Sequence, residues 1–437
     1  YFGGEPVGNS GSYPGWVPVN SGTTGAISGV DYINPFVAFA VGVDLGSSET
    51  GMILRTINGG QTWTRQQSNI TSLAGLNDVS FADVNTGLAV GYSGIITGTT
   101  NAGSDWVQQT SGTPQWIHAV DMLDINNAFA CGSSNTILHT SNGGLNWETQ
   151  ISGTPTNLLG IDYINPTTAT AVGSPGIIIR TTDAGLNWVS QTGGGNLNLT
   201  CVKFIDVNNG IAISYEGPVL RTTNGGVDWV QTDSLSGSAM SISYIDSANA
   251  FIVTSYGGYD NRIYHSIDGG LSWILQTTDN ANYAYGSVSF ADANNGLITG
   301  AEGMILRTSN GGVFSGTNTA HNRNGLNLPI GDFQNTDDSI NINITGNSNA
   351  YTLSNTYGVT RIYLKIDTVL HTNDVDLEFY LEHNGIIDTL IYRNGGSGAN
   401  FLGTFLNDAT NFPLVSGAAP FRGSFKPYRP LSKFSGQ

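Results

Sequence analysis

Residues 181–188 read Thr-Thr-Asp-Ala-Gly-Leu-Asn-Trp, and this octapeptide recurs along the chain. Close copies, each ending in Trp, occupy residues 56–63, 99–106, 140–147, 222–229 and 266–273. A degenerate copy at 308–315 keeps the Asn-Gly-Gly core but lacks the Trp. Successive Trp residues lie 43, 41, 41, 41 and 44 positions apart, which is the length of one four-stranded propeller blade. The repeat therefore predicts a seven-bladed β-propeller.

The repeat around the quoted octapeptide shows how one blade is built. Four strands are predicted in it, over residues 158–164, 168–173, 176–181 and 188–191. In the turn between the last two, the Asp183 carboxylate can accept hydrogen bonds from turn amides, and Gly185 can adopt positive φ. Trp188 can fill the space between strands. We therefore interpret the acidic residues of this motif as folding devices and not as catalytic carboxylates.

The two ends of the repeat array complement each other. The last repeat has no Trp after Gly312, whereas residues 15–19 read Gly-Trp-Val-Pro-Val ahead of the first repeat. We expect these residues to supply the outer strand of the seventh blade. Such closure of the ring removes exposed sheet edges.

Composition narrows the classes of function. Charged residues make up 11% of the 437 residues, and the formal net charge is −17. The chain has no Lys/Arg cluster to neutralise phosphates, which argues against nucleic acid as a partner. No apolar run is long enough to span a bilayer. The start at Tyr1, without Met or a signal peptide, is expected of a processed or trimmed product.

The two cysteines, Cys131 and Cys201, occupy different offsets in different repeats. Cys131 stands where the next repeat has Val172, a buried strand position. We therefore expect two small core side chains in place of a disulfide or a metal pair.

Residues 15–316 resemble the Asp-box propellers, and within them the photosystem II stability and assembly-factor group. The resemblance lies in Gly-Met-Ile-Leu-Arg-Thr-Ile-Asn-Gly-Gly-Gln-Thr-Trp at 51–63 and Gly-Leu-Ala-Val-Gly at 87–91. It implies the propeller fold. It does not imply one activity, because this fold serves sialidases, other glycosidases, assembly factors and surface proteins.

After a predicted N-terminal tail (1–14), the propeller (15–316) and a polar linker (317–329), residues 330–437 resemble the P-domain. The matching stretches are 366–377, 395–401, 404–409, 418–423 and 430–436. The resemblance implies a β-sandwich of the jelly-roll type that lacks its last strands at Gln437. Either the chain is truncated there, or a neighbouring chain donates the missing strand. The P-domain resemblance also implies Ca²⁺ at Asp374, Asp376 and Asp408, the only cofactor expected.

No catalytic constellation is found in the propeller sequence. A sialidase needs arginines that converge on one carboxylate, but Arg55, Arg180, Arg221 and Arg307 share one offset and should form a ring around the blades. The histidines form no metal or triad pattern. We therefore expect a protein that is not an enzyme.

Aspartates of the inner strands form the first candidate site. Asp31, Asp121 and Asp162 share one offset, Asp78 lies two positions earlier in its repeat, and Ser80 and Lys203 occupy the shared offset in theirs. These residues predict an acidic sector of the axial channel. The sector either holds a hard cation or is simply a solvated polar channel.

Aromatic residues on the loops between blades form the second candidate site. They are Trp116, Tyr256, Tyr259, Tyr283 and Tyr285. Exposed aromatics there would suit sugar stacking or protein contact, and packing beneath a loop is the alternative.

Short motifs also predict glycosylation. The Asn-x-Thr sequons begin at Asn69, Asn198 and Asn343, and O-glycan-like triplets contain Ser234, Ser339, Thr368 and Thr389. Motifs this short also arise by chance in a chain rich in Asn and Thr.

These observations favour a secreted or cell-surface bacterial protein, similar to exported proteins of Bacteroidota, that binds a protein or itself. It would serve as an interaction platform or as a filament subunit with strand donation between chains. The first alternative is a propeller that binds surface glycans or hydrolyses glycosides. The second is a chaperone resembling the photosystem assembly factors, although that function gives no reason for a P-domain.

Overall fold

The computed structural model describes residues 15–44, 51–70, 74–255, 260–279 and 283–312, together with five strands of the C-terminal part. The chain divides into two compact units, Tyr1–Phe314 and Ser315–Gln437. Each unit is described by itself below.

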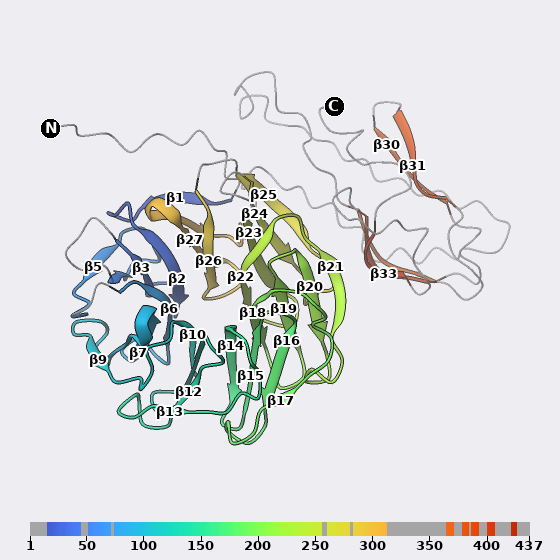
Figure 1. Ribbon diagram of the computed structural model, residues 1–437. Coiled ribbons are helices and arrows are strands. Elements are labelled where there is room, and N and C mark those ends of the chain that lie inside the picture. The colour runs from blue at the N-terminus through green and yellow to red at the C-terminus, as the bar shows by residue number, and fades with distance from the viewer. Residues whose placement is uncertain are drawn as a thin grey trace. The chain divides into compact units, whose positions relative to one another are not determined.

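The first unit is a β-propeller whose described residues form seven four-stranded antiparallel sheets around a central axis (Figure 1). Blade 1 consists of β2 (Ala26–Tyr32), β3 (Ala38–Val43), β4 (Gly51–Thr56) and β5 (Thr64–Gln66). Blade 2 consists of β6 (Leu76–Phe81), β7 (Gly87–Gly91), β8 (Ile96–Thr99) and β9 (Val107–Gln109). Blade 3 consists of β10 (Ile117–Met122), β11 (Ala128–Gly132), β12 (Ile137–Thr140) and β13 (Glu148–Thr149). Blade 4 consists of β14 (Leu158–Asn165), β15 (Thr168–Gly173), β16 (Ile177–Thr181) and β17 (Val189–Ser190).

The remaining blades follow the same order. Blade 5 consists of β18 (Leu199–Phe204), β19 (Gly210–Ser214), β20 (Pro218–Thr222) and β21 (Val230–Ser234). Blade 6 consists of β22 (Ser238–Tyr244), β23 (Ala250–Ser255), β24 (Asn261–Ser266) and β25 (Ile274–Asp279). Blade 7 consists of β26 (Tyr285–Phe290), β27 (Asn295–Gly300), β28 (Met304–Ser309) and β1 (Val17–Asn20). Two one-turn 3₁₀ helices, η1 (Tyr92–Gly94) and η2 (Ala301–Gly303), lie between the second and third strands of blades 2 and 7. No helix in the described part of the chain is both long and apolar enough to cross a membrane.

The predicted closure of the ring by the N-terminal strand is confirmed. β1 pairs antiparallel with β28, from Val17 opposite Arg307 to Asn20 opposite Met304. Trp16 is 3% exposed and packs edge-to-face on Phe290, with ring centroids 5.8 Å apart. It fills the place of the Trp that the last repeat lacks.

The octapeptide hairpins form as predicted, and their Thr, Ser, Asp and Asn side chains accept amides of their own blade. In blade 4 the Thr181 hydroxyl accepts from the Gly185 amide at 2.9 Å, and the Asp183 carboxylate accepts from the Asn187 amide at 2.9 Å. The Ala184 amide donates to the Thr167 carbonyl at 2.9 Å. That bond ties the hairpin to the turn between the first two strands, and equivalent bonds occur in the other blades. The hairpins and these turns therefore share one face of the ring, which we call the Asp-box face.

Polar side chains connect neighbouring blades near the outer rim. Gln109 of blade 2 donates to the Gly143 carbonyl at 3.2 Å and accepts from the Trp147 indole at 2.9 Å. Gln191 and Gln276 make the same pair of contacts with the next blade. These glutamines lie three positions after the Trp of their own repeat.

The repeated arginines also bind across blades. Arg180 donates to the Val207 carbonyl at 2.7 Å, and Arg221 donates to the Gly269 carbonyl at 2.8 Å. Their guanidinium groups therefore reach the next blade around the ring, which agrees with the predicted ring arrangement.

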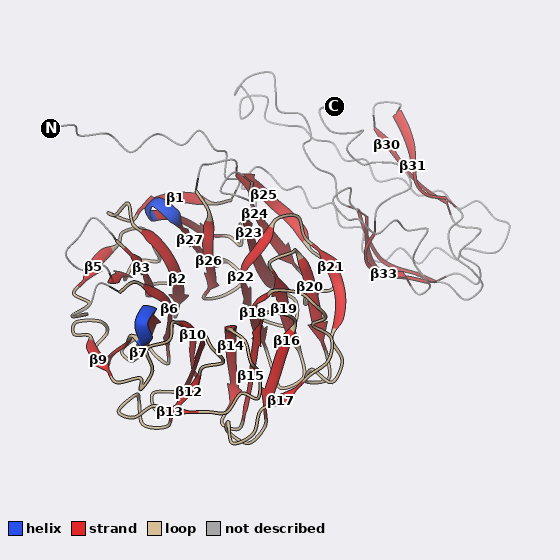
Figure 2. Cartoon of the chain, viewed as in Figure 1, coloured by secondary structure: helices blue, strands red, loops and turns tan. Residues whose placement is uncertain are grey.

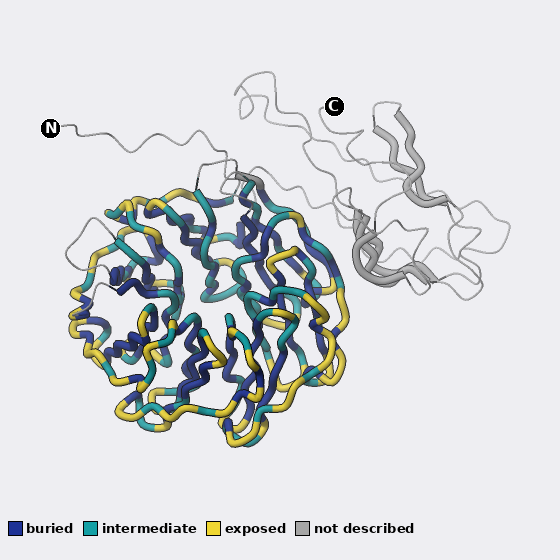
Figure 3. The backbone as a smooth tube through the Cα atoms, viewed as in Figure 1, coloured by how far each residue is buried: buried dark blue, intermediate teal, exposed yellow. Residues whose placement is uncertain are grey.

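The propeller core lies between the sheets, and most exposed positions follow the turns and outer strands (Figure 3). Cys131 is fully buried there, as expected, whereas Cys201 is only half-buried and faces the axis. Both thiols are free. The expectation of a core position is confirmed for Cys131. Cys201 packs against the core between blades 5 and 6, and it also lines the axial cavity.

In the second unit the structure describes β29 (Leu364–Leu370), β30 (Glu378–His383), β31 (Ile386–Tyr392), β32 (Asn400–Leu406) and β33 (Phe421–Phe425) (Figure 2). β32 pairs antiparallel with β29 and parallel with β33, and β30 pairs with β31. The predicted tail (1–14) and linker (317–329) lie outside the described residues, as do Asp374, Asp376 and Asp408. The sandwich, its calcium site and strand donation therefore remain predictions.

Candidate functional site

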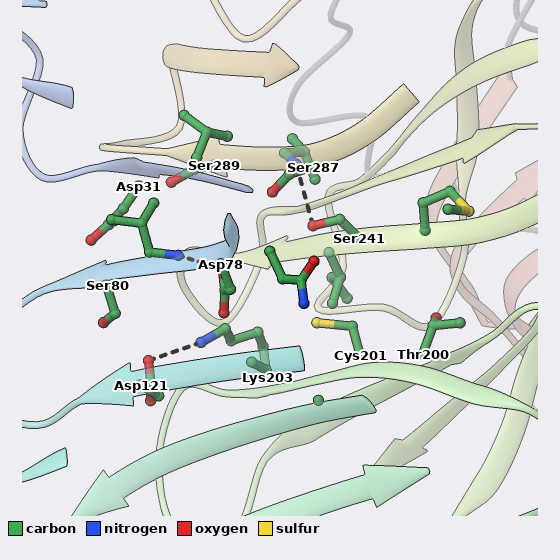
Figure 4. A pocket seen from close by; sticks show the side chains of 18 of the residues that line it. Asp31, Asp78, Ser80, Asp121, Thr200, Cys201, Lys203, Ser241, Ser287 and Ser289 are labelled. Atoms are coloured by element: carbon green, nitrogen blue, oxygen red, sulfur yellow. Dashed lines mark hydrogen bonds and ion pairs between the residues drawn. The ribbon is translucent and has the colours of Figure 1, made fainter. Parts of the chain in front are cut away.

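The inner strands of all seven blades surround an axial cavity of about 310 Å³. Each inner strand, from β2 to β26, contributes side chains to its wall. Figure 4 shows Asp31, Asp78, Asp121 and Lys203 around this space. The structure thus brings the predicted acidic residues to the axis, with Asp162 bound to Lys203 beside them.

One position of each inner strand forms what we call the inner ring. Its members are Asp31, Ser80, Asp121, Asp162, Lys203, Ser243 and Ser289. All except Lys203 accept a hydrogen bond from a backbone amide of the next blade, at 2.7–3.1 Å. For example, Asp31 accepts from the Phe81 amide at 2.7 Å, and Ser289 accepts from the Tyr32 amide at 2.9 Å, across the closing seam. The ring therefore joins the blades through their inner edges.

Lys203 breaks this series because an ammonium group has no acceptor. Its Nζ lies 3.0 Å from Asp162 Oδ1 and 3.3 Å from Asp121 Oδ1. Two carboxylates of blades 3 and 4 therefore share one cation from blade 5.

Asp78 lies two positions before the inner ring in blade 2. Its two oxygens accept from the Val79 amide at 2.9 Å and from the Val120 amide of blade 3 at 3.0 Å. It therefore forms a second hydrogen-bonded link between blades 2 and 3.

Burial shifts the acidity of this cluster. It raises the pKa of Asp31 to about 7 and that of Asp78 to about 6, against the lowering effect of their amide hydrogen bonds. Burial also raises the pKa of Asp162 to about 6, although Lys203 opposes that rise. Burial disfavours the charged form of Lys203 itself, but Asp121 and Asp162 outweigh it and hold the Lys203 pKa well above its usual value.

The hard-cation alternative for this sector gains no support. Within the described residues no group of three or more His, Cys, Asp or Glu side chains is placed to hold a metal ion. The carboxylates are instead directed at backbone amides and Lys203.

The predicted aromatic cluster is only partly on the surface. Trp116 is 50% exposed and lies against Tyr92 of η1, with ring centroids 4.6 Å apart. Tyr283 is half-buried against the core between blades 6 and 7. The expectation of an exposed Tyr285 is wrong, because this residue begins β26 and is fully buried in that core. Tyr256 and Tyr259 lie outside the described residues.

Two sequon asparagines have engaged side chains. Asn69 Nδ2 donates to the Trp106 carbonyl at 3.2 Å, and Asn198 donates to Glu216. Ser234 is half-buried in β21. Thr368 and Thr389 lie in β29 and β31, whereas Asn343 and Ser339 fall outside the described residues. Glycosylation remains a prediction at all of these positions.

These features define a closed Asp-box propeller with an acidic axial cavity. The family model described as Photosynthesis system II assembly factor YCF48 matches residues 10–157, 60–196, 106–240 and 150–282, in overlapping registers that reflect the repeat. The chain belongs to this family.

Solved structures give the same fold. "YCF48 bound to D1 peptide" is 20% identical, with 69% of this chain and 96% of that chain covered and a TM-score of 0.55. "YCF48 from Cyanidioschyzon merolae" is 19% identical, with 67% and 98% covered and a TM-score of 0.55. The WD40 propeller domain of Doa1 is 12% identical, with 68% and 97% covered and a TM-score of 0.54. At these identities the similarity shows the fold alone. No curated protein matches this chain.

Proposed function

We propose that this chain is a YCF48-like assembly factor whose propeller binds a segment of a partner protein and catalyses no reaction. Membership of the YCF48 family carries the proposal. The solved structure of a YCF48 propeller bound to a D1 peptide provides a model for such binding on a similar fold. A photosystem subunit as the partner is the narrowest form of the proposal.

The arrangement of the axial carboxylates supports a binding function. Each predicted channel aspartate already accepts a backbone amide from its own or the next blade, and Asp121 and Asp162 also hold Lys203. Side chains held in this way are positioned as part of the scaffold. Asp31, Asp78 and Asp121 line the cavity, so they offer a fixed polar wall to a ligand.

Selection of peptides from a displayed random library against the purified full chain tests the proposal. We expect selected peptides to bind in calorimetric titration and to be recovered unchanged afterwards. A library that yields no binding peptide would overturn the proposal, as would cleavage or modification of the bound peptides.

Glycan binding with glycoside hydrolysis is the second candidate. The observation in its favour is that burial raises the pKa of Asp31 to about 7, a value suited to a general acid in a cavity. A panel of fluorogenic glycosides tests it. Turnover that is abolished by Asp31→Asn would replace the binding function with this one, and the absence of turnover across the panel would remove it.

The predicted location outside the cell and the predicted self-association are retained as part of the proposal. The first is tested by fractionation of the native source with an antibody to the chain. The second is tested by light scattering of native material, in which polymers would support filament formation and discrete monomers would exclude it.

A further inference from the structure

We propose that one arc of the inner ring, formed by Ser289, Asp31 and Ser80, binds the carboxamide group of a glutamine or asparagine side chain in the partner segment. We refer to these three residues as the open arc. The inference rests on the proposed function and names the side chain by which the cavity recognises the segment.

The members of the open arc lie next to one another in the ring. Ser289 Oγ accepts from the amide of Tyr32, the residue that follows Asp31, at 2.9 Å. Asp31 Oδ2 accepts in turn from the amide of Phe81, the residue that follows Ser80, at 2.7 Å. Figure 4 shows Ser289, Asp31 and Ser80 one after another along one side of the cavity that they line.

Each member keeps hydrogen-bonding capacity that no described residue uses. Asp31 Oδ1 accepts no hydrogen bond from them, because the Phe81 amide binds the other carboxylate oxygen. The Ser80 and Ser289 oxygens accept amides at 3.0 and 2.9 Å, but neither hydroxyl proton has an acceptor in the part of the chain that the structure describes. The open arc therefore presents one carboxylate oxygen between two hydroxyl donors.

The other charged residues of the ring satisfy one another. Asp121 and Asp162 each place one oxygen on an amide of the next blade and the other within 3.3 and 3.0 Å of Lys203 Nζ. Lys203 also acts on Asp31. Burial raises the pKa of Asp31 to about 7, against the lowering effects of the Phe81 amide and the Lys203 charge. The open arc therefore needs a hydrogen-bonding partner and not a second cation.

A carboxamide group matches the donors and acceptors of the open arc. Its N–H can donate to Asp31 Oδ1 while its carbonyl oxygen, on the same edge, accepts from a neighbouring serine hydroxyl. A trans peptide group points its N–H and C=O in opposite directions. Ammonium and guanidinium groups carry no acceptor, and a carboxylate carries no donor for Asp31.

The depth of the open arc favours a long side chain. All seven inner strands carry a β-bulge three residues before the inner ring, as at Ser28 before Asp31. Because the turn after each inner strand lies on the Asp-box face, these bulges lie at the other end of the cavity. At about 3.3 Å per strand residue, the open arc is about 7–10 Å from that end. Serine and threonine hydroxyls are therefore too short to reach it from a segment that crosses the bulges.

The test uses the full chain and the peptides selected from the displayed library. Each peptide is synthesised with a fluorescent label, as selected and with its carboxamide residues replaced one at a time. Glutamine is replaced by glutamate or methionine, and asparagine by aspartate or leucine. These replacements keep the size of the side chain and change its donors and acceptors. Binding is measured by fluorescence anisotropy.

We expect each selected peptide to contain one carboxamide residue on which its binding depends. Replacement of that residue by the matching carboxylate or apolar side chain should weaken binding at least about tenfold, because hydrogen-bonding groups in the cavity then lose their partner. Replacement of arginine or lysine in the same peptides should have a smaller effect.

Asp31→Asn tests the arc itself. Its carbonyl oxygen can still accept the Phe81 amide, so its NH₂ group takes the place of Oδ1 and presents a donor. The preference for carboxamide over carboxylate should fall by about tenfold or more. Asp162→Asn is the matched control, because it removes the same charge from the same ring and keeps an acceptor for the Phe204 amide. It should change this preference by less than about threefold.

The results distinguish the two proposals. If peptides bind without dependence on a carboxamide residue, or if Asp31→Asn and Asp162→Asn change the preference equally, this inference is overturned while the proposed function stands. If no peptide binds the chain, both are overturned. Thermal unfolding verifies that each variant is folded, and the peptide replacements test the inference on the unmodified chain in any case.

Discussion

The Asp-box hairpins and the inner ring both repeat around the propeller, but they differ in how much their chemistry varies. Every hairpin uses a Thr or Ser hydroxyl to accept the amide of the Gly four positions later, as in Thr140 and Gly144 at 2.9 Å. The inner ring instead contains Asp, Ser and Lys at equivalent positions. The hydroxyl and carboxylate bonds of a hairpin close one blade, whereas inner-ring bonds join two. The hairpins are thus chemically uniform, whereas the residues of the inner ring, which faces the cavity, vary from blade to blade.

This difference indicates which part of the repeat can carry function. A hairpin must satisfy its own amides in every blade, so its residues have little freedom. An inner-ring residue needs only an acceptor for the next blade, and either a carboxylate or a hydroxyl supplies it. The choice between them then sets the charge of the cavity without changing the fold.

The largest expected loss of stability comes from Trp16, which takes in blade 7 the place of the hairpin Trp of the other blades. Trp16→Ala removes a 3%-exposed side chain that seals blade 7, so we expect a loss of about 3–5 kcal/mol of unfolding free energy. Denaturant unfolding measures it. A loss below about 1 kcal/mol would show that this strand is not needed for closure.

Among the inner-ring residues, replacement of Lys203 should show the effect of charge on stability most strongly. Lys203→Met leaves Asp121 and Asp162 without their shared cation. We expect a loss of about 1–3 kcal/mol near pH 8, less than for a fully buried pair because Lys203 is 34% exposed. The loss should shrink near pH 5, where the Asp162 pKa of about 6 allows protonation. Equal losses at both pH values would contradict the assignment of these ion pairs.

The contribution of Asp31 to stability should depend on pH in the opposite sense to that of a salt-bridged carboxylate. Because its folded pKa of about 7 exceeds the unfolded value of 3.8, its stabilising effect is full at acid pH and is lost as pH rises through 7. Asp31→Asn should therefore raise stability by about 1–2 kcal/mol near pH 8 relative to its effect near pH 5. Denaturant midpoints at the two pH values measure this, and identical pH profiles for variant and parent would refute it.

Removal of the hairpin hydroxyl should lower the unfolding free energy by the same amount in any blade and at any pH. Thr222→Val removes an acceptor for the Gly226 amide at 2.8 Å, and Thr140→Val removes its counterpart in blade 3. Each should cost about 1–2 kcal/mol, because a buried amide is left without its acceptor. If the two variants lost clearly different amounts of unfolding free energy, the hairpins would not be uniform, and their contrast with the variable inner ring would fail.

The smallest effect is expected on the Asp-box face. Leu186 lies in a hairpin and is 81% exposed, so Leu186→Ser should change the unfolding free energy by less than about 0.5 kcal/mol. Peptide binding should also be unchanged. Loss of binding in this variant would show that the peptide binds on the Asp-box face and not at the axial cavity.

The sequence predicts the blades well because each one is a local unit. For the repeat around Trp188 it predicts strands at 158–164 and 168–173, and the structure has β14 at Leu158–Asn165 and β15 at Thr168–Gly173. Its repeat offsets also place Asp31, Asp121 and Asp162 together at the axis. Periodicity alone is enough for these predictions.

Contacts between blades are harder to predict from sequence. That Asp31 accepts the Phe81 amide depends on how two inner strands about one repeat apart lie side by side, which no local pattern contains. Likewise, the sequence shows Lys203 at the shared offset but not its position between two carboxylates. Tyr285 begins β26 and is fully buried, whereas the sequence alone does not show which aromatic residue of that region begins the strand. The recurring Gln three positions after the Trp was the available signal for the contacts at the outer rim.

Hydrogen–deuterium exchange on the full chain, with and without the tightest-binding selected peptide, tests the central claim most directly. The account predicts added protection in the inner strands that line the axial cavity, such as β6 and β10. Protection confined to the Asp-box hairpins, with these two segments unchanged, would contradict it.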